Sequence, residues 1–380
     1  MSLSFEEICM DLSQFDSYRT AARIANRLLH REREHEIRHT TLKYRVIANG
    51  TSLASAYDSK TADILKQHGI NPASGIITED TLVDESVTKP SLPESYSMED
   101  PEGIIADYNA GRKENEKIVN SELVGKVERS SKNCCYISID DIGVKHQKEY
   151  RKRGEKKVAK YVENTLIHIQ SDKGKYTITT IGMRKAFTML VAFLLSNGLM
   201  ENTRLIFLSD GATCIKDYIE EFFGFREYTL ILDWLHLKKK CKEYLSMAVK
   251  GKDKEERQKI TKGLLHILWA GNTDNAIAYL SGLEQRNIKN PARLEQLKDY
   301  LGRKKPNIHC YALRAAFGLR TSSNTVEKDN DINVAQRQKH NGMSWSKAGS
   351  GALAVITVAR HNNELYNWIR TDNISFRLVA

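Results

Sequence analysis

The chain has 380 residues, of which 41% are hydrophobic and 28% are charged, which is typical of globular proteins with about two or three domains. Its net charge of +10 suits a polyanionic partner, although a solvated basic surface gives the same balance. The six cysteines form no C-x-x-C pair, which argues against a zinc ribbon or a thioredoxin-like site and favours a reducing, cytoplasmic location. The longest apolar run, residues 186–195, is too short to cross a bilayer, and the acidic start lacks the basic region of a signal peptide.

The first 70 residues are expected to be mainly helical. Apolar residues recur at helical spacing from Tyr18 to Leu29, and residues 61–68 predict another short helix that stops at Gly69. Several short basic helices suit either a helix-turn-helix DNA reader or a plain helical bundle. Residues 71–130 hold four of the six prolines among many polar residues, which predicts a linker or extended segment and a domain boundary near residues 125–132.

From residue 135 the pattern changes to strands and helices in the order β-β-β-α-β-α-β-α. The predicted strands are 135–139, ending at Asp140 and Asp141; 164–170 and 175–181, joined as a hairpin; 204–209, ending at Asp210; and 228–232, ending at Asp233. The predicted helices are an amphipathic one over 183–197, one over 213–223 and a basic one over 235–249. This order matches an α/β architecture, the ribonuclease-H-like fold with its mixed sheet.

Residues 251–320 show no strand pattern and predict a helical insertion. A helix resumes from Ser322, and residues 342–369 predict a short loop followed by a closing helix. The expected catalytic domain therefore consists of residues 131–250 and 321–370, preceded by the helical N-terminal region and the linker.

Three acids stand where such a fold would bring them together: Asp140, Asp210 and Glu327. Hard divalent cations such as Mg²⁺ take oxygen ligands, and two such ions can activate the attacking oxygen and stabilise the leaving one in phosphoryl transfer. Each acid also has an ordinary explanation, because aspartates form turns at strand ends and Glu327 fits a capping box. Alternation puts Asp140 on one face of its strand with Ser138, and Asp141 on the other; we favour Asp140, and Asp141 remains the alternative.

Asp233 and His236 form Asp-x-x-His at the start of the basic helix. His236 can orient a phosphate or a metal-bound carboxylate, whereas an Asp N-cap with a packed histidine is the structural alternative. Basic residues that we expect to contact DNA phosphates follow directly or lie in the basic stretch 145–160; they are Lys238, Lys239, Lys240, Arg151 and Lys152.

Together these residues resemble the Mutator-like superfamily of bacterial insertion-sequence transposases, which use an Asp-Asp-Glu triad on a ribonuclease-H-like fold. The resemblance covers about residues 130–360 and is carried by Ile139-Asp140, Ser209-Asp210-Gly211-Ala212, Asp233-Trp234-Leu235-His236, Ser323-Asn324-Thr325-Val326-Glu327-Lys328 and Gly342-Met343-Ser344-Trp345-Ser346. It implies a DNA transposase in which Asp140, Asp210 and Glu327 hold two Mg²⁺ ions, which Mn²⁺ can replace. Water would cleave the element's ends, and the freed 3′-hydroxyl would attack target DNA.

The resemblance also implies partners. These are double-stranded DNA, at the element ends and the target, and further copies of the chain in a homodimer or higher oligomer, associated with the nucleoid when bound. Asp233 and His236 would match the superfamily's signature, residues 251–320 its insertion, and residues 1–120 the part that binds terminal repeats. A ribonuclease-H-like nuclease and a non-catalytic, transposase-derived DNA-binding protein remain the alternatives.

Overall fold

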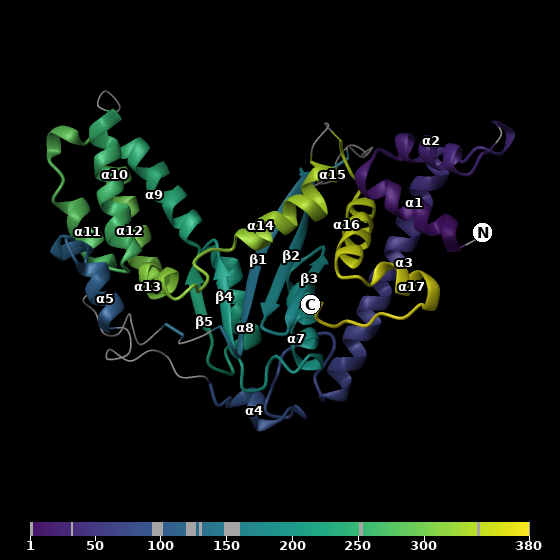
Figure 1. Ribbon diagram of the computed structural model, residues 1–380, viewed down its shortest axis with the longest axis horizontal. Coiled ribbons are helices and arrows are strands. Elements are labelled where there is room, and N and C mark those ends of the chain that lie inside the picture. The colour runs from purple at the N-terminus through teal and green to yellow at the C-terminus, as the bar shows by residue number, and fades with distance from the viewer. Residues whose placement is uncertain are drawn as a thin grey trace, which may run out of the picture.

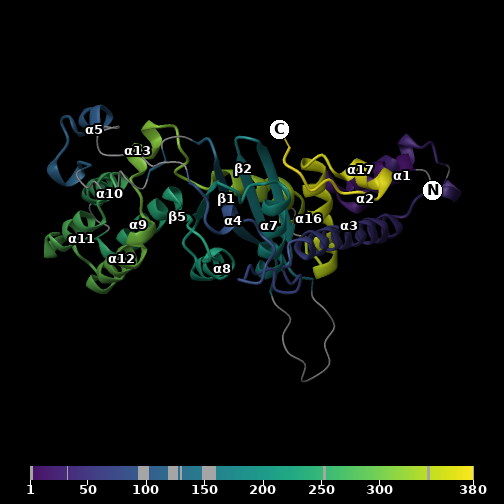
Figure 2. The ribbon, with the colours of Figure 1, turned by 90° about the horizontal axis from the view of Figure 1, so that it is seen from below.

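The computed structural model describes residues 3–31, 33–92, 102–118, 127–128, 131–147, 160–250, 254–339 and 343–379. A five-stranded sheet lies in the middle of the molecule, and helices gather in two lobes on either side of it (Figure 1). The view from below shows the same lobes at opposite ends of an elongated molecule (Figure 2). Among the described residues, no helix is long and apolar enough to cross a membrane.

The sheet is mixed and has the strand order β3-β2-β1-β4-β5. Its strands are β1 (Cys134–Lys145), β2 (Tyr161–Ser171), β3 (Gly174–Thr180), β4 (Arg204–Ser209) and β5 (Thr229–Leu232). The first three strands are antiparallel neighbours, whereas β4 runs parallel to β1 and β5 parallel to β4. The predicted order of strands and helices is confirmed. Each element was predicted from the local periodicity of its apolar residues, which does not depend on which strands pair.

The first strand is longer than predicted. β1 does not end at Asp140 and Asp141 but continues to Lys145, because its whole second half pairs with β2, as far as Lys145 opposite Tyr161. Its parallel pairing with β4 ends earlier, at Ser138. Asp140 therefore lies within a strand that extends beyond the carboxyl end of its neighbour β4.

Three helices connect and follow the parallel strands: α7 (Met183–Ser196), α8 (Thr213–Phe223) and α9 (Trp234–Ala248). Their positions agree with the predictions, but α7 is not amphipathic in place, since every residue from Ala186 to Leu195 is buried. The cause is tertiary, because α7 packs between the strands β2 and β3 and the long N-terminal helix α3 (His39–Gln67). A helix covered on both sides is buried all round.

Residues 254–316 are helical, as predicted for the insertion. The helices are α10 (Lys254–Trp269), α11 (Thr273–Ser281), α12 (Pro291–Lys304) and α13 (Tyr311–Ala316). They form the left-hand lobe of Figure 1 together with α9, and their apolar faces share a core with β4 and β5. The short helix α5 (Glu102–Asn109) packs against α13 at the edge of this lobe.

The N-terminal helices form the right-hand lobe of Figure 1. They are α1 (Leu3–Phe15), α2 (Tyr18–Leu28) and α3, a single helix of 29 residues that includes the separate short helix predicted at 61–68. α3 packs along α16 (Lys347–His361), so closely that a Cβ on Gly50 would lie 2.5 Å from the carbonyl oxygen of Ala352. The two helices therefore lie in close contact at this point.

The remaining elements are short. They are α4 (Glu85–Thr88), α14 (Asn324–Asn330), a π-helical turn at Asp331–Ala335, α15 (Gln336–Gln338), α17 (Leu365–Thr371) and 3-10 turns at Arg33–His35, Glu114–Glu116, Gln285–Asn287 and Lys305–Asn307. The predicted helix from Ser322 and the closing helix are thus present. α14 is the one that matters for the site, because it lies across the sheet in front of β1 and β2 (Figure 1).

Candidate active site

Three aspartates lie in one row across the neighbouring strands β1, β4 and β5. The parallel pairing of β1 with β4 ends at Ser138 opposite Leu208. Two residues further on, the same alternation brings Asp140 and Asp210 to that face of the sheet. The register between β4 and β5 continues in the same way to Asp233, directly after β5. Strand pairing alone therefore collects three carboxyl groups that are far apart in the chain.

Asp140 is half-buried beneath α14, and burial raises the pKa of its carboxyl to about 6. The negative charge of Asp210 raises this pKa further, whereas the backbone N–H of Asp141, which donates to Oδ1 at 2.9 Å, lowers it. The side-chain amide of Asn330 in α14 donates to the other oxygen, Oδ2. Asp140 thus holds the C-terminal end of α14 through Asn330. Burial of its carboxylate is not fully offset by nearby hydrogen bonds and positive charges, so its pKa stays raised.

Asp141, the alternative first acid, lies apart from this row. It is the next residue along the same strand, so its side chain points to the opposite face. The side chain is exposed, and its Oδ1 accepts a hydrogen bond of 2.5 Å from the hydroxyl of Thr165 on β2. Strand alternation groups Asp140 with the other acids, although desolvation and the charge of Asp210 raise the pKa of Asp141 as well.

Asp210 follows β4 and begins the turn into α8. Its Oδ1 accepts from the backbone N–H of Ala212 at 2.8 Å, and Gly211 takes a φ of +87°, which suits glycine. The turn-forming role that strand-end aspartates usually have is therefore present here. From α12, the Lys304 ammonium donates to the carbonyl oxygen of Gly211 at 2.7 Å, and burial lowers the pKa of this lysine.

Asp233 is fully buried and caps the N-terminus of α9, which is the structural alternative considered for this residue. Its Oδ1 accepts from the backbone N–H of His236 at 2.8 Å. Its Oδ2 accepts from both the backbone N–H and the hydroxyl of Ser323, the latter at 2.7 Å. Burial by itself would raise the pKa of Asp233, but the hydrogen bonds from His236 and Ser323 hold it below its ordinary value. One carboxylate thus ties the start of α9 to the start of α14.

His236 lies between two acids that come from different parts of the chain. Its Nδ1 is 3.3 Å from Oδ1 of Asp233 and 3.7 Å from Oε1 of Glu327. The interaction with Asp233 raises the pKa of the imidazole above its ordinary value, and the charges of Glu327 and Asp210 add to this while burial opposes it. The protonated form of His236 is therefore more stable here than that of a free histidine.

Glu327 is in the first turn of α14, and its side chain is 45% exposed. A capping box, the ordinary explanation for this residue, is not formed, since the Ser323 side chain accepts no hydrogen bond from the backbone N–H groups of α14; its hydroxyl donates to Asp233. α14 passes into the π-helical turn soon after Glu327, and such turns often occur at functional sites. Tertiary contacts, not a capping motif, determine where this glutamate lies.

The acids are of a type that suits a hard divalent cation. Asp140 and Asp210 contribute oxygen donors, and the raised pKa of Asp140 marks a negative charge that a cation would compensate. Within the described ranges, however, no three His, Cys, Asp or Glu side chains lie close enough together to hold a metal ion. The donor set fits such an ion, whereas Glu327 lies beside His236 and does not complete a coordination shell.

A basic groove lies between α9 and α10, with a volume of about 510 Å³, and its lining includes Trp234, the residue after Asp233. Lysine and arginine side chains from both helices line it: Lys238, Lys242, Arg257 and Lys262. Of the predicted phosphate contacts, Lys238 lines this groove, whereas Lys239 is exposed beside it and Lys240 pairs with Glu243 at 3.0 Å. Arg151 and Lys152 lie outside the described residues.

Several residues of the site were not predicted from the sequence. Asn330 lies one helical turn after Glu327, and this spacing on a predicted helix was a usable signal. Ser323 was considered only as a helix cap. Lys304 and the basic residues of α10 belong to the helical insertion, where no pattern in the chain points to a site near Asp210.

Comparison with known proteins assigns no family to the chain: no model of a known protein family matches it, and no curated protein matches it.

Proposed function

We propose that this protein is a DNA transposase of the Mutator-like superfamily, with a ribonuclease-H-like catalytic domain. The observation that carries the proposal is the meeting of Asp140 and Asp210 on adjacent strands with His236 and Glu327, the last delivered by a helix from beyond the insertion. The strand order β3-β2-β1-β4-β5, with β2 antiparallel, supports the fold assignment.

In this proposal Asp140 and Asp210 would hold two Mg²⁺ ions together with Glu327, which would have to move from its place beside His236 to join them. Bound there, the ions would supply activation of the attacking oxygen and stabilisation of the leaving oxygen. The chain's own residues have separate tasks. Asn330 holds the carboxylate of Asp140 in position, and His236, which lies beside Glu327, would donate a hydrogen bond to a phosphate oxygen of DNA.

The reaction consists of two phosphoryl transfers. Water attacks a phosphodiester at the end of the element, and the P–O bond to the 3′-oxygen breaks, leaving a 3′-hydroxyl and a 5′-phosphate. That 3′-hydroxyl then attacks a phosphodiester of the target, forming a new P–O bond and releasing a second 3′-hydroxyl. Both steps need the same in-line geometry, so one set of acids serves both.

The surface charge supports a DNA substrate. The basic groove lies between α10 and α9, the helix that carries His236, and it offers several cations to phosphates. At the other end of the molecule, α2 carries Arg19, Arg23 and Arg27, which are all exposed and spaced four residues apart on one face. We assign terminal-repeat binding to this N-terminal lobe, and we expect a dimer because the reaction has two ends.

The test is Mg²⁺-dependent cleavage and joining of the DNA that flanks the gene. Asp140→Asn, Asp210→Asn and Glu327→Gln should each abolish both steps while DNA binding persists. Asp141→Asn is the matched control, because this residue lies on the other face of the same strand and should keep activity. Cleavage that survives any of the three triad substitutions would remove that acid from the proposed triad.

The same experiment separates the alternatives. A wild-type protein that cuts but never joins ends would be a nuclease. A wild-type protein that binds the DNA and does not cut it, with either Mg²⁺ or Mn²⁺, would refute the enzymatic proposal.

A further inference from the structure

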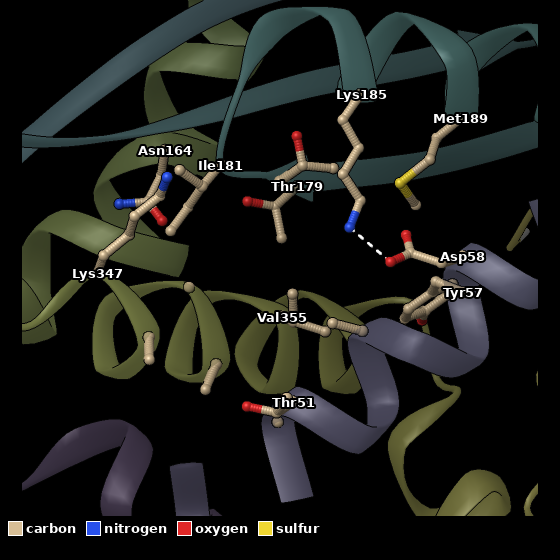
Figure 3. Close-up of a pocket in the computed structure, with 16 residues that line it drawn as sticks. Thr51, Tyr57, Asp58, Asn164, Thr179, Ile181, Lys185, Met189, Lys347 and Val355 are labelled. Carbon is tan, nitrogen blue, oxygen red and sulfur yellow. Dashed lines mark hydrogen bonds and ion pairs between the residues drawn. The ribbon is translucent and has the colours of Figure 1, made fainter. Parts of the chain in front are cut away.

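A second cavity, of about 450 Å³, lies away from the acids, between α3, α16, the end of the β2–β3 hairpin and the start of α7 (Figure 3). Most of its wall is apolar and is formed by Ala54, Ile181, Met189, Ala352 and Val355. A volume of this size at the junction of two parts of a fold is typical of small-molecule sites.

One wall of the cavity ends in a buried amide with a fixed orientation. Gln338 donates its side-chain N–H to the carbonyl oxygen of Ser350, so its Oε1 is the acceptor for the Ser350 hydroxyl, at 2.7 Å. That hydroxyl has given away its only proton, and it must therefore accept from Nδ2 of Asn164, at 2.9 Å. This chain of donors turns Oδ1 of Asn164 into an acceptor that still needs a donor.

Oδ1 of Asn164 has no hydrogen-bond partner among the described residues, although the side chain is almost completely buried, with 1% of the residue exposed. The hydroxyl of Thr179 also has no hydrogen-bond partner in the described part of the chain. It is buried and belongs to a residue that lines the same cavity. Both residues lie on one face of the hairpin, and Figure 3 shows both at the sheet side of the cavity. Buried polar atoms of this kind normally have a partner.

The charges at the cavity are already paired or lie at its edge. Lys185 binds Asp58 at 2.7 Å, and this ion pair joins α7 to α3 (Figure 3). Lys347 is exposed at the start of α16. The inner end of the cavity therefore offers one neutral acceptor and one hydroxyl, and the ammonium of Lys347 is the unpaired charge among the described lining residues.

We infer that this cavity binds an uncharged, largely apolar molecule of about bicyclic aromatic size that carries an N–H beside a C=O, as in a lactam. The N–H would donate to Oδ1 of Asn164, and the carbonyl would accept from the Thr179 hydroxyl. The apolar body would occupy part of the space between α3 and α16. The inference is independent of the proposed transposase activity.

The probe is 2-quinolone, titrated calorimetrically into the full chain, with N-methyl-2-quinolone as the matched compound that lacks the donor. We expect saturable binding of 2-quinolone and at least about tenfold weaker binding of the N-methyl compound, because methylation leaves Asn164 without a donor. Thr179→Val should weaken 2-quinolone by about threefold to tenfold. It should leave the unfolding midpoint unchanged or higher, since the hydroxyl has no partner to lose.

A second variant tests the location. Ala54→Phe fills the cavity from α3 and should abolish binding of 2-quinolone. Equal binding of the two quinolones, unchanged binding by Ala54→Phe, or no saturable binding of 2-quinolone up to its solubility limit would each overturn the inference. Thr179→Val keeps the test decisive even if Ala54→Phe does not fold.

Discussion

Replacing Ser323 by alanine tests how the site is assembled. The substitution removes the hydroxyl that donates to Oδ2 of the fully buried Asp233 at 2.7 Å, and it leaves the backbone N–H in place. Hydrogen bonds to charged groups contribute roughly 1.5–3 kcal/mol, so we expect the free energy of unfolding to fall by about that amount at pH 7. The same change loosens the start of α14, and we expect joining activity to fall with it because Glu327 loses its anchor.

Urea unfolding at several pH values measures the first effect. The pKa of Asp233 is lowered by its hydrogen bonds, so the stability that the carboxylate contributes is present above its unfolded pKa of about 4 and is lost as pH falls through the lower folded value. The difference between wild type and Ser323→Ala should therefore shrink below about pH 4. Ser322→Ala is the matched control and should be close to wild type. A Ser323→Ala protein as stable as wild type at pH 7 would refute the role we give to this contact.

Two further predictions concern charge. Burial raises the pKa of Asp140 to about 6, so the ionised carboxylate destabilises the fold above that pH. Asp140→Asn should therefore be more stable than wild type at pH 8, by up to about 3 kcal/mol, and this advantage should vanish near pH 4. Urea unfolding without divalent cations measures the difference. An Asp140→Asn protein that is less stable than wild type at pH 8 would contradict this reasoning, because it would mean that a neighbouring positive charge already stabilises the carboxylate. In the basic groove, Lys238→Ala and Lys242→Ala should each weaken DNA binding irrespective of DNA sequence. Each should also lower the slope of log affinity against log salt concentration by about 1, measured by fluorescence anisotropy between low and moderate salt. Lys240→Ala is the control and should weaken binding less, because Glu243 holds the ammonium of Lys240.

The parts of the fold that follow from local patterns could be predicted. Apolar runs with a period of two marked the strands, and helical spacing marked α8, α9 and the helices of the insertion. The turn between β2 and β3 was readable from Asp172 to Gly174, because those residue types favour a tight reversal. The Asp-x-x-His sequence likewise indicated a possible N-cap for α9, because the capping hydrogen bond joins residues that are three positions apart.

What failed depended on partners elsewhere in the chain. The predicted end of β1 was wrong because β2 continues to pair with it, and α7 was predicted amphipathic although α3 covers its outer side. The hydrogen bond between Asn330 and Asp140 joins residues 190 apart, and no period in the sequence reports on it. Lys304 reaches Gly211 across 93 residues for the same reason.

For this protein, the sequence by itself determined which segments are strands and helices, their order, and which acids stand near strand ends, because these properties depend on neighbours within a few residues. Only the tertiary structure decided that β1 and β4 pair in the register that continues to Asp140 and Asp210, that Asp233 ties α9 to α14, and that Glu327 lies beside His236. Those outcomes depend on strand register and on helix packing between distant segments. The free energy of such contacts depends on residues that are distant in the sequence, and local sequence patterns do not identify these partners.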